Sequence, residues 1–130
     1  MKTISFSVEG KCPSYNMSFK INHNLRQVYL TNTAKLFKRN VMCKIPKVKV
    51  KDNEFLTVEI SVMQPWYYKN GNLKKQDVQN MDKLYIDAIC QALGVDDSRV
   101  ISSKINKVNS RETYSCVMIG FTDKMPEVSE

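Results

Sequence analysis

Apolar and polar residues alternate along two segments of this 130-residue chain, residues 3–8 and 55–63. A period of two residues places successive side chains on opposite faces of a strand, so both segments are expected to be half-buried strands. Two later segments, 100–108 and 114–121, also have the composition of strands. Because only the short polar stretch Asn109-Ser110-Arg111 and its neighbours separate them, we expect these two segments to pair as a final hairpin.

Two other segments repeat their apolar residues with the 3.6-residue period of a helix. The first follows Thr31 or Asn32, either of which can cap it, and ends at Pro46. The second is predicted over residues 78–92, with Gly94 as its C-terminal stop. One face of this second helix is apolar, with Met81, Leu84, Tyr85, Ala88 and Ile89. Its opposite face is polar, with Gln79, Asn80, Lys83 and Asp87.

The predicted order of elements is β-α-β-α-β-β, which indicates the α+β class. We expect a single domain in which two helices pack against one mixed β-sheet. A chain of this length is sufficient for one core but not for two. The domain is predicted to span residues 1–122, and residues 123–130 are expected to form a polar C-terminal tail that contains Pro126.

Positive charge exceeds negative charge in this chain. There are 20 Lys and Arg residues against 13 Asp and Glu, which gives a formal net charge of +7. Residues 35–51 contain no acid but seven basic residues: Lys35, Lys38, Arg39, Lys44, Lys47, Lys49 and Lys51. Such a segment favours a nucleic acid or an anionic membrane as partner, although a solvated lysine surface is an equally good interpretation of charge alone.

Cysteine usage and the N-terminal sequence indicate a cytoplasmic protein. The four cysteines lie far apart, no C-x-x-C pair occurs, and the chain has one His, so a clustered zinc site is not expected. Each cysteine lies in or beside an apolar run and is expected to act as a small buried hydrophobe in a reducing compartment. Residues 1–10 alternate instead of forming a signal sequence, and no apolar run is long enough to cross a membrane.

The candidate chemistry lies around the second predicted helix. Lys74 and Lys75 come shortly before Asp77, and the acidic pair Asp96-Asp97 comes shortly after the helix. Carboxylate oxygens suit a hard divalent cation, and lysines suit a polyanion, so the combination indicates metal-assisted cleavage of a phosphodiester. The alternative is structural: Asp77 is then the N-cap of the helix, and Asp96-Asp97 supplies acceptors in a helix-to-strand turn.

These residues resemble those of the RusA-type Holliday-junction resolvases. Members of that family have an Asp-x-Asp-Asn sequence and a following Lys at the start of a helix, with an Asp-Asp pair after the helix. Here the matching residues are Asp77-Val78-Gln79-Asn80, Lys83 and Asp96-Asp97. The family's Pro-Ser-x-Asn loop corresponds to Pro13-Ser14-Tyr15-Asn16, and Tyr29-Leu30-Thr31 also fits, so the resemblance spans about residues 4–108.

The resemblance implies a RusA-like fold and a metal-dependent endodeoxyribonuclease that acts in DNA recombination and repair. A homodimer of such a protein resolves four-way junction DNA by paired nicks, with Mg²⁺ as cofactor and Mn²⁺ able to substitute. No small-molecule substrate and no membrane partner are implied. By analogy, Asp77 and Asp97 are catalytic and bind the metal together with Gln79, while Lys83 is the catalytic lysine. The implied DNA contacts are Ser14, Tyr15, Asn16, Lys74, Lys75, Gln76 and Asn80.

One position departs from the family motif, because Gln79 replaces the second Asp of Asp-x-Asp. An amide offers the cation a neutral oxygen, so the site loses a full negative charge. Asp82 projects toward the apolar edge of the helix. Asp87 lies two turns beyond Gln79 and can pair with Lys83, one turn before it. Neither replaces the missing carboxylate. The alternative function is therefore a junction-binding or other DNA-binding protein of the same fold that cuts weakly or not at all.

An aromatic segment, Trp66-Tyr67-Tyr68, allows a further alternative, a basic RNA-binding module in which these rings stack on bases. The segment directly follows an apolar strand. These aromatics could equally well pack in the core or in a dimer interface. The first helix is the other candidate surface for such an interface.

Overall fold

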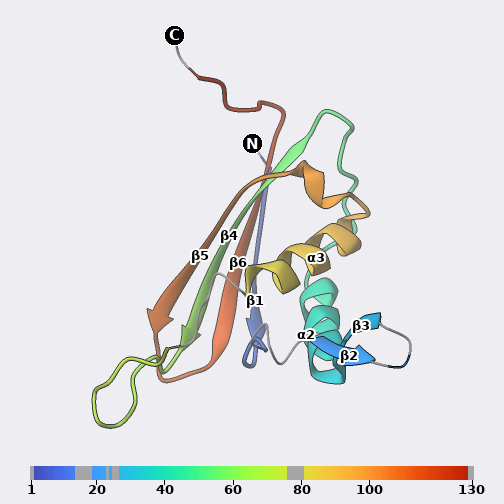
Figure 1. Ribbon diagram of the computed structural model, residues 1–130. Helices are drawn as coiled ribbons and strands as arrows, with labels where there is room; N and C mark the ends of the chain where they lie inside the picture. Colours follow the sequence, from blue (N-terminus) through green and yellow to red (C-terminus); the bar gives the residue numbers. More distant parts are fainter. Residues whose placement is uncertain (1, 14–18, 23, 25–26, 76–80, 129–130) are drawn as a thin grey trace.

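The computed structural model spans residues 1–130, and it describes all of them except 1, 14–18, 23, 25–26, 76–80 and 129–130. Its centre is one mixed β-sheet with two α-helices packed against a single face, as Figure 1 shows. This arrangement confirms the predicted α+β class and the mixed sheet with two packed helices. Residues 123–128 have no helix or strand and are exposed.

The sheet has the strand order β1-β6-β4-β5, formed by Lys2–Glu9, Tyr114–Thr122, Phe55–Gln64 and Val100–Asn109. Strand β4 pairs in parallel with β5 and antiparallel with β6, and β6 pairs antiparallel with β1. Every second residue of β4 is buried, from Leu56 to Gln64. The alternation in the sequence therefore marks the buried face of β4, which confirms the predicted half-buried strand.

The predicted final hairpin is wrong, although both of its strands exist. Strand β4 lies between β5 and β6, and the Ser110 N–H donates to the carbonyl of Gln64 at 2.9 Å as the chain passes the end of β4. Neighbouring strands are about 4.8 Å apart, so four residues, 110–113, are enough to cross one strand. Strand β5 is already paired in parallel with β4, and β6 takes the other edge of β4.

Helix α2 spans Asn32–Cys43, and the Thr31 hydroxyl accepts a hydrogen bond from the Ala34 N–H at 3.2 Å, as the capping signal predicts. The buried residues of α2 are Ala34, Phe37 and Val41. Phe37 meets Tyr85 of α3 edge to face, with ring centroids 5.2 Å apart.

Helix α3 spans Asp82–Leu93, and Gly94 follows it with a φ of 69°, a conformation that a residue without Cβ adopts at little cost. All five residues of its predicted apolar face are buried. The described helix begins at Asp82, and its N-cap position is Met81, which makes no side-chain capping bond. The start predicted at residue 78 and the candidate cap Asp77 lie outside the described residues.

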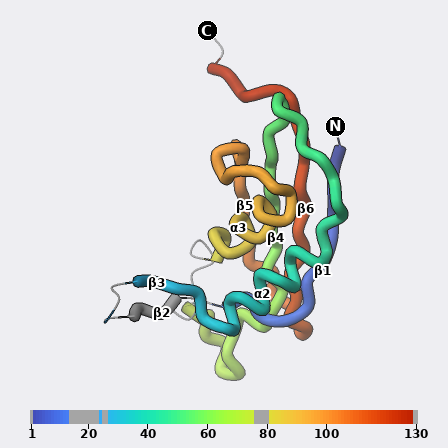
Figure 2. Tube along the Cα trace, turned by 90° about the vertical axis from the view of Figure 1, so that its right-hand side faces the viewer, coloured from blue at the N-terminus to red at the C-terminus, as the bar shows by residue number. Residues whose placement is uncertain are grey.

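A second, two-stranded sheet pairs β2, Phe19–Asn22, with β3, Gln27–Leu30. No local pattern predicted either strand, because each strand is only four residues long. This small sheet lies beside α2 and apart from the main sheet, as Figure 2 shows.

The four cysteines are free, but their environments differ from one another. Cys12 and Cys90 are buried as predicted and Cys116 is half-buried, whereas Cys43, in the last turn of α2, is exposed. The expectation that every cysteine is a buried hydrophobe is therefore wrong for Cys43. In the described part of the chain, no helix has both the length and the apolar character needed to cross a membrane.

Candidate functional site

The candidate residues are distributed along a β-α-β unit formed by β4, α3 and β5. Lys74 and Lys75 lie in the loop that follows β4, and Lys83 lies in the first turn of α3. Asp97 begins a short 3₁₀ helix, η2, which spans Asp97–Arg99 and leads directly into β5. In Figure 1, the loop and η2 lie toward opposite ends of the sheet.

The loop after β4 is held by backbone hydrogen bonds. The Lys74 N–H donates to the carbonyl of Trp66 at 2.7 Å, and Tyr67 forms an isolated β-bridge with Leu73. The Lys74 ammonium lies 5.7 Å from the centre of the Tyr68 ring, and Lys75 is exposed. Both lysines therefore lie on a structured hairpin, where Lys74 is partly exposed and Lys75 is exposed.

Lys83 is exposed on the polar side of α3, as predicted from the helical period. Its neighbours Leu84 and Tyr85 are buried against the sheet and α2, so packing fixes the rotation of the helix and directs Lys83 away from the core. Asp87, one helical turn further on, is half-buried on the same helix. The first turn of α3 thus presents one ammonium group to the surface.

The two residues of the acidic pair after α3, Asp96 and Asp97, have different environments. Asp96 is the N-cap of η2, and its carboxylate accepts a hydrogen bond from the Ser98 N–H at 3.1 Å. Hydrogen bonds from Ser98 hold the pKa of Asp96 below its usual value. For Asp96, the structural interpretation as a turn acceptor is therefore confirmed. Asp97 is exposed at the surface of the same turn.

Arg99 fixes this acidic turn against the start of β4. Its guanidinium donates to the carbonyl of Lys51 at 3.2 Å and to the carbonyl of Glu54 at 2.8 Å. Lys51 is the last residue of the basic segment 35–51, so that segment ends beside the turn that carries Asp97. Nothing in the local sequence pattern predicted this link, because residues 51 and 99 approach only when β5 pairs with β4.

The basic segment 35–51 is displayed on the surface. Lys35 and Arg39 project from α2, and Lys44, Lys47, Lys49 and Lys51 are exposed along the chain that leads to β4. A phosphate backbone that followed this segment would reach the turn of Asp97. The backbone of Lys51, at the end of this basic segment, thus lies beside the turn that carries the candidate carboxylate Asp97.

The structure does not bring Lys83 and Asp97 together within one chain. They lie at opposite ends of α3, and a helix of 12 residues is about 18 Å long. Within the described ranges, no group of three or more His, Cys, Asp or Glu side chains is placed to hold a metal ion. The remaining predicted site residues lie outside the described residues: Ser14, Tyr15, Asn16, Gln76, Asp77, Gln79 and Asn80.

A buried polar cluster that no sequence pattern predicted connects α3, β6 and the chain that follows β1. The Tyr85 and Ser115 hydroxyls form a short hydrogen bond between α3 and β6. Cys12 is buried next to Tyr85, and burial raises the pKa of its thiol to about 12, which rules out a reactive thiolate at neutral pH. Burial also raises the pKa of Tyr85 far above its usual value. This cluster holds the chain before Ser14 against α3.

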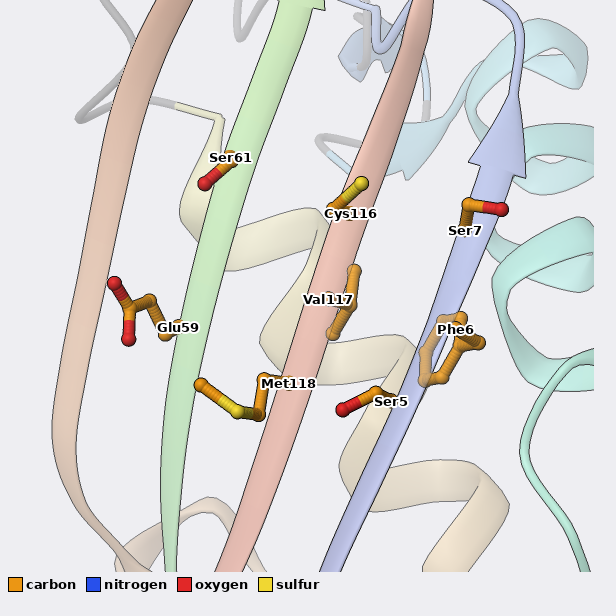
Figure 3. Close-up of a pocket in the computed structure, with 8 residues that line it drawn as sticks. All are labelled: Ser5, Phe6, Ser7, Glu59, Ser61, Cys116, Val117 and Met118. Atoms are coloured by element: carbon orange, nitrogen blue, oxygen red, sulfur yellow. The ribbon is translucent and has the colours of Figure 1, made fainter.

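A hollow of about 490 Å³ lies on the face of the sheet that the helices leave open, shown in Figure 3. Its polar lining consists of serines and of Glu59, with Cys116 and Met118 beside them. It contains one carboxylate and no basic side chain, and it is separated from the candidate residues by the thickness of the sheet. Its lining and its position therefore argue against it as the site of phosphodiester chemistry, whatever its size.

Together these features define a class: a basic α+β protein whose exposed lysines and turn carboxylate suit an enzyme that acts on nucleic acid. A family model described as "Endodeoxyribonuclease RusA" matches residues 10–120. The chain therefore belongs to the RusA endodeoxyribonuclease family, as its motifs indicated. That family consists of nucleases that act on Holliday junctions in recombination, so the protein is a hydrolase whose partner is DNA.

Two other comparisons add no functional information. No curated protein matches the chain. Among solved structures, the chain is similar to 2C-methyl-D-erythritol 2,4-cyclodiphosphate synthase from Plasmodium vivax, with 9% sequence identity and a TM-score of 0.33. The similarity covers 92% of this chain and 93% of that chain. At this TM-score, it supports no conclusion about the fold or the activity.

Proposed function

We propose that this protein is a Mg²⁺-dependent endodeoxyribonuclease that resolves Holliday junctions in cytoplasmic DNA by paired nicks, acting as a homodimer. The observation that carries the proposal is the family match over residues 10–120, within which Lys83 and Asp97 occupy motif positions and are exposed. The basic segment 35–51, which ends at the turn of Asp97, adds electrostatic attraction for the phosphate backbone.

Each candidate residue has a proposed role. Asp77 and Asp97 bind the cation together with the amide oxygen of Gln79, a hard oxygen donor set that suits Mg²⁺ or Mn²⁺. The bound cation supplies polarisation of the phosphate and a water of lowered pKa. The Lys83 ammonium stabilises negative charge on the scissile phosphate. The DNA is positioned by Ser14, Tyr15, Asn16, Lys74, Lys75, Gln76 and Asn80.

The homodimer is proposed for two reasons. A four-way junction has approximate two-fold symmetry, so two opposed sites related by an isologous interface match it. In addition, the length of α3 separates Lys83 from Asp97 in one chain. A two-fold axis can bring the amino end of one α3 to the carboxyl end of the other, and we propose that each site is completed in this way.

A second candidate function is junction binding without efficient cleavage. Gln79 favours it, because the amide leaves the proposed metal site one negative charge short of the family motif. Incubation of the purified protein with a synthetic four-way junction in Mg²⁺ tests both candidate functions. Symmetrical nicks support the nuclease, whereas a stable complex without nicks in Mg²⁺ or Mn²⁺ supports the binding protein.

A further inference from the structure

The loop of residues 65–75 extends past the carboxyl end of β4 and away from both helices, as Figure 1 shows. Two hydrogen bonds close its tip: the Tyr68 N–H donates to the carbonyl of Asn72 at 2.8 Å, and the Gly71 N–H donates to the carbonyl of Tyr68 at 2.9 Å. Gly71 has a φ of 87°, which suits the tight turn there. The loop is therefore a small structured hairpin.

Trp66 anchors this hairpin to the sheet. Its side chain is 2% exposed, and its indole N–H donates to the carbonyl of Val62 at 3.1 Å. Its backbone N–H donates to the side chain of Asn109 at 3.0 Å, at the end of β5. The Lys107 ammonium covers the ring, 4.7 Å from its centre. Of the three consecutive aromatics, Trp66 is the one committed to the core.

The next two aromatics have the opposite environment. Tyr67 and Tyr68 are 53% and 56% exposed, and Leu73 across the β-bridge is 53% exposed. The hairpin also carries Lys69, Lys74 and Lys75 but no Asp or Glu. Exposed aromatic rings on a segment that also carries lysines are the components with which proteins bind unpaired bases and their phosphates.

We propose that residues 67–73 form a base-stacking element, in which Tyr67 and Tyr68 contact unstacked bases at the branch point of a DNA junction. This inference rests on the proposed function for its choice of substrate. The anchored base of the hairpin matters, because rings that are held in place before binding lose little conformational entropy when they meet a base. The neighbouring lysines contact the phosphate backbone of the DNA and hold the DNA strand over the rings.

Charge argues against the alternative that these tyrosines lie in the dimer interface. If the two hairpins met at a two-fold axis, three lysines from each copy would come together with no acid from the hairpin itself to balance them. A polyanion neutralises the same charges and releases counterions. The hairpin is therefore better suited to nucleic acid than to a second copy of itself.

The test uses a four-way junction with 2-aminopurine at the branch point, and Ca²⁺ in place of Mg²⁺ so that binding is measured without cleavage. Tyr67→Ala combined with Tyr68→Ala is expected to weaken junction binding by roughly 5- to 150-fold for each base that no longer stacks on a ring. It should also remove the fluorescence change of 2-aminopurine on binding. The salt dependence should be unchanged, because tyrosine carries no charge.

Two controls accompany this variant. Tyr67→Phe with Tyr68→Phe keeps the rings and should retain both the affinity and the fluorescence change. Met118→Ala removes a side chain of similar exposure, 44%, from the open face of the sheet, and should bind as the wild type does. Near-ultraviolet circular dichroism of the buried Trp66 reports whether the alanine variant keeps its fold.

Two results would overturn the inference: wild-type affinity and fluorescence in the alanine variant, or a change in its oligomeric state instead of in its DNA binding. If the double variant loses its fold, the single variants Tyr67→Ala and Tyr68→Ala test the inference by junction affinity and by the fluorescence of 2-aminopurine. Failure of the proposed function gives a different pattern, in which the wild type binds the junction and alters 2-aminopurine but never nicks DNA in Mg²⁺.

Discussion

The two ends of helix α3 have opposite chemistry. The chain that leads to its amino end presents Lys74 and Lys75 on an aromatic hairpin without a single acid, and the first turn of the helix adds Lys83. Its carboxyl end leads into a turn with Asp96 and Asp97, which Arg99 holds against the start of β4. One end is thus suited to contact phosphates and bases, and the other to contribute a carboxylate to a cation.

The difference suggests that base stacking by the hairpin and metal binding by Asp97 can be tested separately. Strands β4 and β5 are ten residues each, about 33 Å long, and they hold the hairpin and the acidic turn at opposite ends. Side chains so far apart are not expected to compensate for one another's loss within one chain. A variant in the hairpin should therefore affect DNA binding and spare cleavage, whereas a variant at Asp97 should affect cleavage and spare binding.

The largest effect is expected from the loss of a proposed metal ligand. Asp97→Asn, like Asp77→Asn, should abolish nicking in Mg²⁺, because each substitution removes a charged oxygen ligand from the cation. Junction binding, measured by gel shift in Ca²⁺, should be unchanged or tighter, since one source of repulsion toward phosphate is gone. Asp123→Asn, in the polar tail, is the matched control. Wild-type cleavage by either variant would show that the proposed site is wrong.

Mixed dimers sharpen the comparison further, because they ask whether the two ends of α3 cooperate across the dimer. Lys83→Ala and Asp97→Asn homodimers should both be inactive. In a mixed dimer, a site shared between copies leaves one intact combination, Lys83 of one chain with Asp97 of the other, so a single nick should reappear. A site confined to one chain predicts no nick at all. Differently tagged chains and a labelled junction distinguish these outcomes.

The fold was predictable from the sequence wherever a local pattern decided it. Alternation predicted β4, the Thr31 cap predicted the start of α2, and Gly94 predicted the end of α3. The pairing of β5 was not predictable in this way, because β5 could pair either with the strand before α3 or with the strand that follows it. Partner choice depends on long-range contacts that no short window of sequence contains.

The candidate site was predictable to a similar degree. Motif spacing identified Lys83 and Asp97, and the helical period correctly placed Lys83 on the polar face of α3. The separation of these residues, the hydrogen bonds of Arg99 and the anchoring of Trp66 by Asn109 depend on how β4 and β5 align. The sequence therefore predicted the exposure of Lys83 better than it predicted which residues share a surface, and the catalytic roles of Lys83 and Asp97 stay predictions.

A smaller effect is expected at the hairpin end. Lys74→Ala with Lys75→Ala should weaken junction binding and reduce the slope of log K against log salt by about one unit for each phosphate that the protein no longer neutralises. Once the junction is saturated, the rate of nicking should be close to that of the wild type, because neither lysine touches the cation. Lys124→Ala in the tail serves as the control. An unchanged slope would place both lysines away from the DNA.

The smallest and most informative change is Gln79→Asp, which restores the charge that the family motif has at this position. If the metal site works in weakened form, the substitution should lower the Mg²⁺ concentration needed for half-maximal nicking and raise the rate at limiting Mg²⁺. If the wild type binds junctions without cutting them, the same substitution should switch nicking on. Gln91→Asp, which adds a charge at an exposed position of α3 outside the proposed ligands and DNA contacts, is the control, and an equal gain there would indicate a general electrostatic effect. A slower Gln79→Asp enzyme beside an active wild type would show that the site has adapted to the amide, and the missing charge would then not limit this nuclease.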